Sequence, residues 1–158
     1  MRKTVDRHPI PGPGEGKRGE HGHLGYLLRQ AAGAFRVRLE RAMADLDVTQ
    51  PQFAVLTMLA NYPGLSNADL ARLALLTPQT VSVIVANLER AGAIARHPHP
   101  VHGRIRHIEL TGKGKHLLAQ CGERVRAIEQ DIVNGLSAGE ETAIRRWLAR
   151  VAAPERQE

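Results

Sequence analysis

The sequence has little cysteine and few aromatic residues. Its one cysteine, Cys121, excludes an intramolecular disulfide. Two Phe, two Tyr and one Trp in 158 residues are too few for the aromatic platforms on which single-strand nucleic-acid binders stack bases. Cys121 lies on the apolar side of its predicted helix. This position favours a buried, inert thiol over a redox sensor, although both interpretations stay open.

Membrane, secretion and catalytic signals are also missing. No apolar run approaches the roughly 20 residues of a membrane span, and no signal-peptide pattern is present. We therefore expect a cytoplasmic protein without a membrane partner. The chain has no nucleophile elbow, phosphate-binding loop or HExxH motif, so we expect neither an enzyme nor a bound cofactor or metal.

Positive charge is what the chain has in excess. Its formal net charge is +6. Five Lys and Arg residues and five histidines lie between Ala93 and His116, where Glu109 is the sole carboxylate. A solvated surface usually mixes both signs, so this concentration indicates a segment that binds phosphates.

Capping and periodicity signals divide the chain into elements. Residues 1–22 are rich in Pro and Gly and predict a disordered basic arm. Apolar residues at helical spacing predict a helix from Leu24 to Leu46, with more apolar surface than one neighbour would cover. Outside the central segment, three further helices are predicted to begin at hydroxyl N-caps, which are Thr49, Thr111 and Ser137.

The segment from Ser66 to Leu110 organises the rest of the chain. Ser66 and Asp69 have capping-box spacing, and Thr77-Pro78 begins a second helix after a tight turn. Apolar residues recur in that helix at i, i+3, i+4 and i+7, at positions Val81, Ile84, Val85 and Leu88. Gly92 ends the helix and two short strands follow, which predicts a winged helix-turn-helix.

These residues resemble a known family. The pattern LxxLxxLTxxTVSxxVxxLExxGxIxR, followed by a charged wing and xLTxxG, is similar to the MarR family of bacterial transcription regulators over residues 24–152. The resemblance implies a mainly α fold with a small β-hairpin. The winged helix-turn-helix would occupy 49–110, between dimerisation helices at 23–48 and 111–158. It also implies a homodimer, more often a repressor, on pseudo-palindromic double-stranded DNA at the bacterial nucleoid.

The outer face of the second helix is predicted to enter the major groove. Gln79 can bond to adenine there, and Val83 and Ala86 can contact thymine methyls. Packing of Val83 against a neighbouring helix is the alternative. The predicted DNA contacts on the two helices are Ser66, Asn67, Thr77, Gln79, Thr80, Ser82, Val83, Ala86 and Asn87.

The wing supplies the remaining predicted contacts. The family's wing motif Asp-x-Arg stands here as His102-Gly103-Arg104, so Arg104 is expected in the minor groove without its orienting carboxylate. Arg96 and Arg106 are predicted to be phosphate ligands or strand-face charges.

Other roles stay open. From the resemblance we expect a small aromatic or phenolic effector. Tyr26, Arg29 and Arg36 are candidates for a pocket that accepts an anion, and a surface arginine ladder is the alternative. A metal-responsive regulator would use wing histidines, which are His97, His99 and His102, although the prolines between them separate their side chains. The last alternative is a non-specific architectural DNA-binding protein.

Overall fold

The computed structural model describes residues 10–98 and 106–153. Within them the chain is mainly helical with one two-stranded antiparallel hairpin, as predicted. The elements are the 3₁₀ helix η1 (Gly16–Arg18), α1 (Leu24–Ala42), the 3₁₀ helix η2 (Ala44–Leu46), α2 (Gln50–Asn61), α3 (Asn67–Leu73), α4 (Pro78–Arg90), β1 (Ile94–Pro98), β2 (Arg106–Leu110), α5 (Gly112–Val133) and α6 (Ala138–Ala152).

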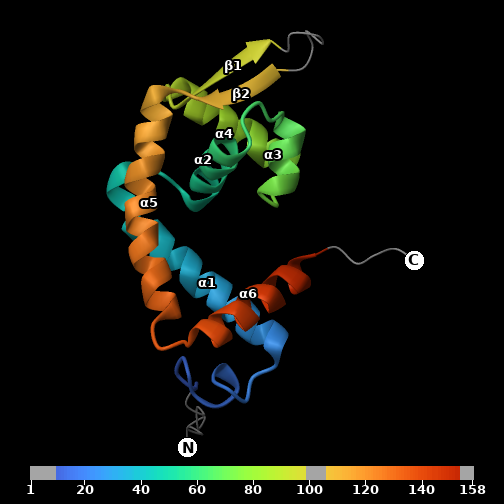
Figure 1. The fold of residues 1–158 in the computed structure, drawn as a ribbon, viewed down its shortest axis with the longest axis vertical. Helices are drawn as coiled ribbons and strands as arrows, with labels where there is room; N and C mark the ends of the chain where they lie inside the picture. Colours follow the sequence, from blue (N-terminus) through green and yellow to red (C-terminus); the bar gives the residue numbers. More distant parts are fainter. Residues whose placement is uncertain (1–9, 99–105, 154–158) are drawn as a thin grey trace, which may run out of the picture.

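The elements form two halves joined by α5. Figure 1 shows α2, α3, α4 and the hairpin at one end, which we call the winged lobe, and α1 and α6 toward the other. α5 runs along one side between the two halves. Among the described residues no single helix is long and apolar enough to cross a membrane. α3 and α4 pass that test only as a pair, and they are bent by 113°.

The predicted hydroxyl caps are present. Side chains of Thr49, Ser66 and Ser137 each form a capping box with the residue three positions on. Those of Thr77 and Thr111 accept hydrogen bonds from backbone N–H groups three residues later. These caps satisfy amides that the first helical turn leaves unpaired, so the helices begin where the sequence predicts.

The first predicted helix ends earlier than its apolar pattern suggests. α1 stops at Ala42 and η2 follows before Asp47, which has a left-handed φ of 52°. The guanidinium of Arg124, on α5, donates to the carbonyl of Ala42 at 2.8 Å and also bonds to Asp45. A contact from a distant helix therefore satisfies the helix end, which the local sequence does not reveal.

The described part of the predicted disordered arm has local structure. Residues 10–22 contain η1, and the Arg18 guanidinium donates to the carbonyl of Pro11 at 2.8 Å. The described residues of this arm therefore form turns. Residues 1–9 lie outside the described residues.

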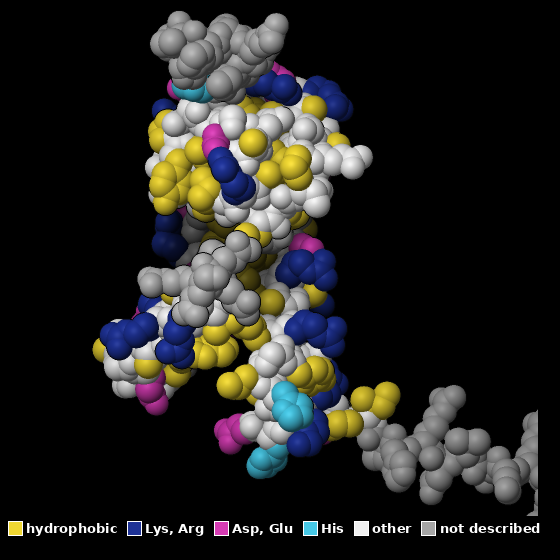
Figure 2. Space-filling model, turned by 90° about the vertical axis from the view of Figure 1, so that its right-hand side faces the viewer, with side chains coloured by type: hydrophobic (Ala, Val, Ile, Leu, Met, Phe, Trp, Pro, Cys, Tyr) yellow, Lys and Arg dark blue, Asp and Glu magenta, His cyan; other side chains and the backbone are white. Residues whose placement is uncertain are grey.

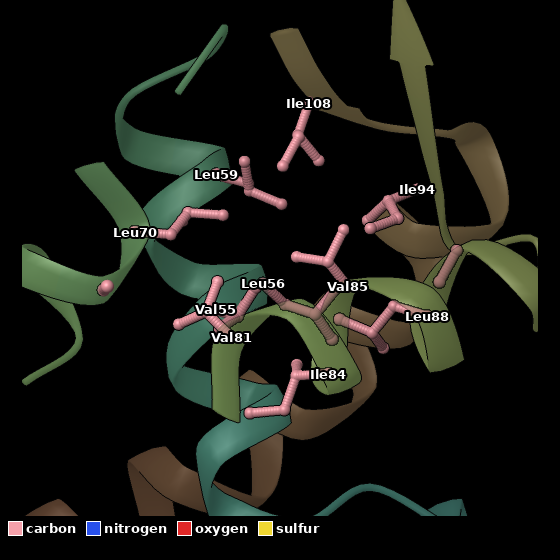
Figure 3. Close-up of a cluster of buried hydrophobic side chains, with 12 residues drawn as sticks. Val55, Leu56, Leu59, Leu70, Val81, Ile84, Val85, Leu88, Ile94 and Ile108 are labelled. Carbon is pink, nitrogen blue, oxygen red and sulfur yellow. The ribbon is translucent and has the colours of Figure 1, made fainter. Parts of the chain in front are cut away.

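The winged lobe has its own apolar core, shown in Figure 3. The predicted stripe of α4 is buried there against α2 and α3, and Ile94 and Ile108 of the hairpin close the core from the wing side. A bridge between Leu65 and Ile108 ties the loop before α3 to β2.

A second buried cluster joins α1 to α5. Its members are Leu39, Met43, Val48, Cys121 and Ile128. Cys121 is fully buried, and this burial raises the pKa of its thiol. The favoured interpretation of Cys121 as an inert core residue agrees with this environment.

Candidate DNA interface

The outer face of α4 is open. Val81 and Val85 are fully buried, whereas Gln79, Ser82 and Asn87 are exposed on the other side of the helix. Val83 is 56 % exposed, so it does not pack against a neighbouring helix. Figure 3 shows the buried stripe pointing into the lobe core, which leaves the opposite face to solvent.

The side chains predicted to contact DNA from this face differ in their exposure and in whether they already form hydrogen bonds within the protein. Gln79 is exposed, and within the described residues its side chain has no hydrogen-bond partner. The Ser82 hydroxyl donates to the carbonyl of Pro78 at 2.9 Å and accepts from the Asn67 amide at 3.4 Å. Ala86 is only half-exposed. Gln79 and Val83 are therefore the side chains most available for base edges.

The hydroxyls at the helix starts already have structural partners. Ser66 Oγ donates to Asp69 Oδ2 at 2.6 Å and accepts from the Asp69 amide. The hydrogen bond from Ser66, followed by that from Arg72, lowers the pKa of Asp69. Thr77 and Thr80 share a hydrogen bond of 2.8 Å between their hydroxyls. These caps fix the two helix N-termini, whose remaining backbone N–H groups can donate to a phosphate.

Arg96 is held by the helix that it follows. Its guanidinium forms a 2.8 Å ion pair with Glu89 of α4, and its side chain is 27 % exposed. Its Nε is buried without a hydrogen-bond partner in the part of the chain that is described. Of the two predicted roles, a strand-face charge agrees better with this geometry than a phosphate ligand. The pair links β1 to the end of α4.

The tip of the wing lies outside the described residues. Arg104, His99 and His102 fall there, so their roles stay predictions from the sequence. The backbone of Arg106 pairs with that of Pro98 in the hairpin, and His97 pairs with His107. No group of three or more His, Cys, Asp or Glu that could hold a metal ion occurs among the residues that the structure describes.

The proposed effector residues on α1 lie in different surroundings. The Arg29 guanidinium sits 5.9 Å from the centroid of the Tyr26 ring, close enough for a cation–π contact. Arg36 forms an exposed ion pair with Glu40 at 3.3 Å. An open groove along α1 includes Arg29 but neither Tyr26 nor Arg36, and its other basic lining residues are Arg18, Arg38 and Arg41. Sequence reasoning did not select these three.

Leu75 is a further feature that sequence reasoning missed. It lies in the turn just before α4, has a left-handed φ of 54° and is 88 % exposed. Left-handed backbone is unfavourable for a residue with a side chain, and nothing in the residue pattern signals it at a leucine. An apolar side chain is therefore displayed beside the N-terminus of the helix with the open face.

Comparison with known proteins agrees with this geometry. Residues 46–105 match the model of the MarR family. The chain is 35 % identical over 130 residues to the HTH-type transcriptional repressor Rv2887 of Mycobacterium tuberculosis. The aligned region covers 82 % of this chain and 94 % of the relative.

Solved structures of Rv2887 are also similar. The complex with DNA has a TM-score of 0.67 at 33 % identity, covering 84 % of this chain and 99 % of that one. The complex with salicylic acid has a TM-score of 0.67 at 35 % identity, covering 84 % and 98 %. One protein with this fold therefore binds both a duplex and an aromatic acid.

Proposed function

This chain belongs to the MarR family of transcriptional regulators, and from that premise we propose that it is a homodimeric repressor that reads double-stranded DNA with α4. The family consists of regulators rather than enzymes. We place its action at the bacterial nucleoid. Each subunit would insert α4 into a major groove and Arg104 of the wing into the adjacent minor groove.

The observation that carries the proposal is the contrast between the two faces of α4. Four apolar side chains anchor the helix in the lobe core, while Gln79, Val83 and Asn87 face solvent. A helix fixed on one side and open on the other fits the width of the major groove. Gln79 can bond to adenine, and Val83 supplies an apolar contact for a thymine methyl.

The other half of the molecule supports a dimer. α6 has 15 residues and none is buried, although Ile144, Leu148 and Val151 are apolar and 41–48 % exposed. Leu24 of α1 and Ile132 of α5 are also exposed. Figure 2 shows exposed apolar side chains in the half that holds α1 and α6. A helix with an apolar stripe must bury it against something, and a second copy places two readers on one symmetric site.

An aromatic acid is the effector class that we propose. Rv2887 has been solved with salicylic acid, and the groove along α1 combines apolar residues with several guanidinium groups. Arg29 lies on this groove and Arg38 is tied to Asp131 at 2.5 Å. A carboxylate would bind a guanidinium that forms no ion pair with a described residue, such as that of Arg29, and the aromatic ring would lie against the apolar residues of the groove.

Selection from random duplexes tests the proposal. Purified protein should enrich one short palindrome, and light scattering of the complex should give two chains per duplex. Salicylate should then lower the affinity for the enriched duplex. Binding without sequence enrichment would favour the architectural alternative, and one chain per duplex would contradict the dimer.

A further inference from the structure

Side-chain and backbone hydrogen bonds connect the end of α4 to the start of α5. Lys113 Nζ donates to the carbonyl of Ala91 at 2.7 Å. Thr111 Oγ1 donates to the carbonyls of Gly92 at 2.7 Å and Ala93 at 3.1 Å, and the Thr111 amide also reaches Ala93 at 3.0 Å. Three successive carbonyls after α4, which is the proposed recognition helix, are thus satisfied from the start of α5.

Thr111 serves both helices at once. Its hydroxyl oxygen accepts from the amide of Gly114 at 3.1 Å, which caps α5, while its proton is shared by the two carbonyls at the end of α4. One hydroxyl therefore uses its donor and an acceptor position at this junction.

Gly114 brings the two backbones together. A Cβ at this position would lie 1.9 Å from the carbonyl oxygen of Ala93, which is itself buried. The requirement is for space, because a side chain cannot fit between α5 and the segment that ends α4.

Lys113 has a different role from its neighbour Lys115. Its ammonium group lies at the C-terminal end of α4, where unpaired carbonyls favour a cation. Lys115 is exposed, and its side chain has no hydrogen bond or ion pair to any described residue. The sequence assigns both lysines to the phosphate-binding charge of the wing region, but the structure gives only Lys113 an intramolecular partner.

The far part of α5 is bonded to α1. Arg124 bonds to the carbonyl of Ala42 and to Asp45, and Arg38 pairs with Asp131. α5 has 22 residues and so extends about 33 Å at 1.5 Å per residue. A change in how α1 packs against α5 can therefore change the position of α4 through the junction.

We propose that Thr111, Lys113 and Gly114 form an α4–α5 clamp that fixes the recognition helix to α5, with Lys113 as a positioning residue and not a phosphate ligand. The expected consequence of the clamp, a fixed spacing of the two DNA-reading helices in a dimer, rests on the proposed function. The clamp itself is a property of one chain.

The first test measures the distance between a site on α4 and a site on α5 within one chain. Spin labels are attached to cysteines introduced by Gln79→Cys on α4 and Glu129→Cys on α5, in a Cys121→Ala background. Labelled protein is diluted with unlabelled protein, so that pulsed electron–electron double resonance reports distances within one chain. Lys113→Met should broaden the distance distribution, and Lys113→Arg should keep it narrow. Lys115→Met is the matched control and should leave it unchanged. Equal widths for Lys113→Met and Lys115→Met would overturn the clamp, whatever the protein does to DNA.

The second test separates positioning from phosphate binding. Affinity for the selected duplex is measured by fluorescence anisotropy at several salt concentrations. Lys113→Met should weaken binding by about fivefold, in the range of mutations that alter coupling, with the salt slope unchanged. A slope lowered by about one unit would identify a phosphate contact and overturn the positioning role. If the unsubstituted protein binds no duplex, the proposed function fails, and the spin-label result still decides the clamp.

Discussion

At the scale of single residues, Val83 is the side chain that we propose to set which base edge this protein reads. It is an exposed apolar side chain on an otherwise polar helix face. The sequence predicts its outward direction because the helical period fixes direction once the buried stripe is known. Its neighbour Ala86 is partly covered, which the period alone does not reveal.

Val83→Asn should change base preference at one position of the site. The amide can bond to adenine where the valine methyls contact thymine, and such a contact contributes about 1–3 kcal/mol of discrimination. Repeating the duplex selection with the variant checks this. An equal loss of affinity for every sequence would contradict the thymine contact.

Leu75→Gly should stabilise the fold. Glycine adopts the left-handed φ of 54° without strain, and the leucine is 88 % exposed, so little burial is lost. Relief of the left-handed backbone, about 1–2 kcal/mol, exceeds the entropy that glycine adds to the unfolded chain, about 0.5–1 kcal/mol. We therefore expect a net gain of about 0.5–1 kcal/mol in the free energy of unfolding, measured by urea denaturation. Leu73→Gly, at the last residue of α3 where φ is not left-handed, is the control and should destabilise the protein. A loss of stability in Leu75→Gly would show that the side chain has a packing role.

Arg96 and Lys113 show where residue-level sequence reasoning ends. Both count as positive charge in the sequence, yet Arg96 pairs with Glu89 and Lys113 bonds to the carbonyl of Ala91. Charge composition records the sign of a residue and not its partner. These partners are set by the packing of the hairpin and α5 against the end of α4.

At the scale of elements, the sequence predicts helix boundaries that depend on neighbouring residues. It does not predict boundaries that depend on contacts with distant residues. The starts of α2, α3 and α6 follow from capping boxes, whose members are three residues apart. The end of α1 depends on Arg124, which is far away in the sequence. A helix boundary set by such a contact is invisible to a periodicity argument.

The capping boxes predict a dependence of stability on pH. Hydrogen bonds from Ser66 and from Ser137 lower the pKa of Asp69 and Glu140 in the folded state. The unfolded chain therefore takes up protons first, so stability present above about pH 4 should fall as the pH drops through the lowered pKa values. Urea midpoints between pH 5 and pH 2 measure the loss. In the double variant Ser66→Ala and Ser137→Ala, the urea midpoint should depend less on pH. An unchanged pH dependence would show that the capping boxes do not cause it.

Gly114→Ala should destabilise the junction of α4 and α5. The added methyl group would overlap the carbonyl of Ala93, and overpacking of this kind costs about 1–3 kcal/mol. Gly122→Ala lies in the same helix with only the end of the Arg126 side chain nearby, so it should stabilise by about 0.5–1 kcal/mol. Thermal unfolding of both variants compares them directly. A similar gain in both would mean that the close approach does not matter.

At the scale of the whole molecule, the division of labour follows from where the apolar residues are buried. The winged lobe has a complete core in one chain. The half with α1 and α6 leaves apolar side chains exposed, because no element of the same chain covers them among the described residues. The sequence predicts this surplus on the first helix, whereas the lack of any buried residue on α6 could be seen only in the structure.

Hydroxyl-radical footprinting of the selected duplex tests the central claim most directly. If α4 of each subunit reads a major groove, the protein should protect two tracts related by two-fold symmetry, with their centres separated by about 10 base pairs or a multiple. Protection that covers the duplex evenly, or a single unpaired tract, would contradict the account.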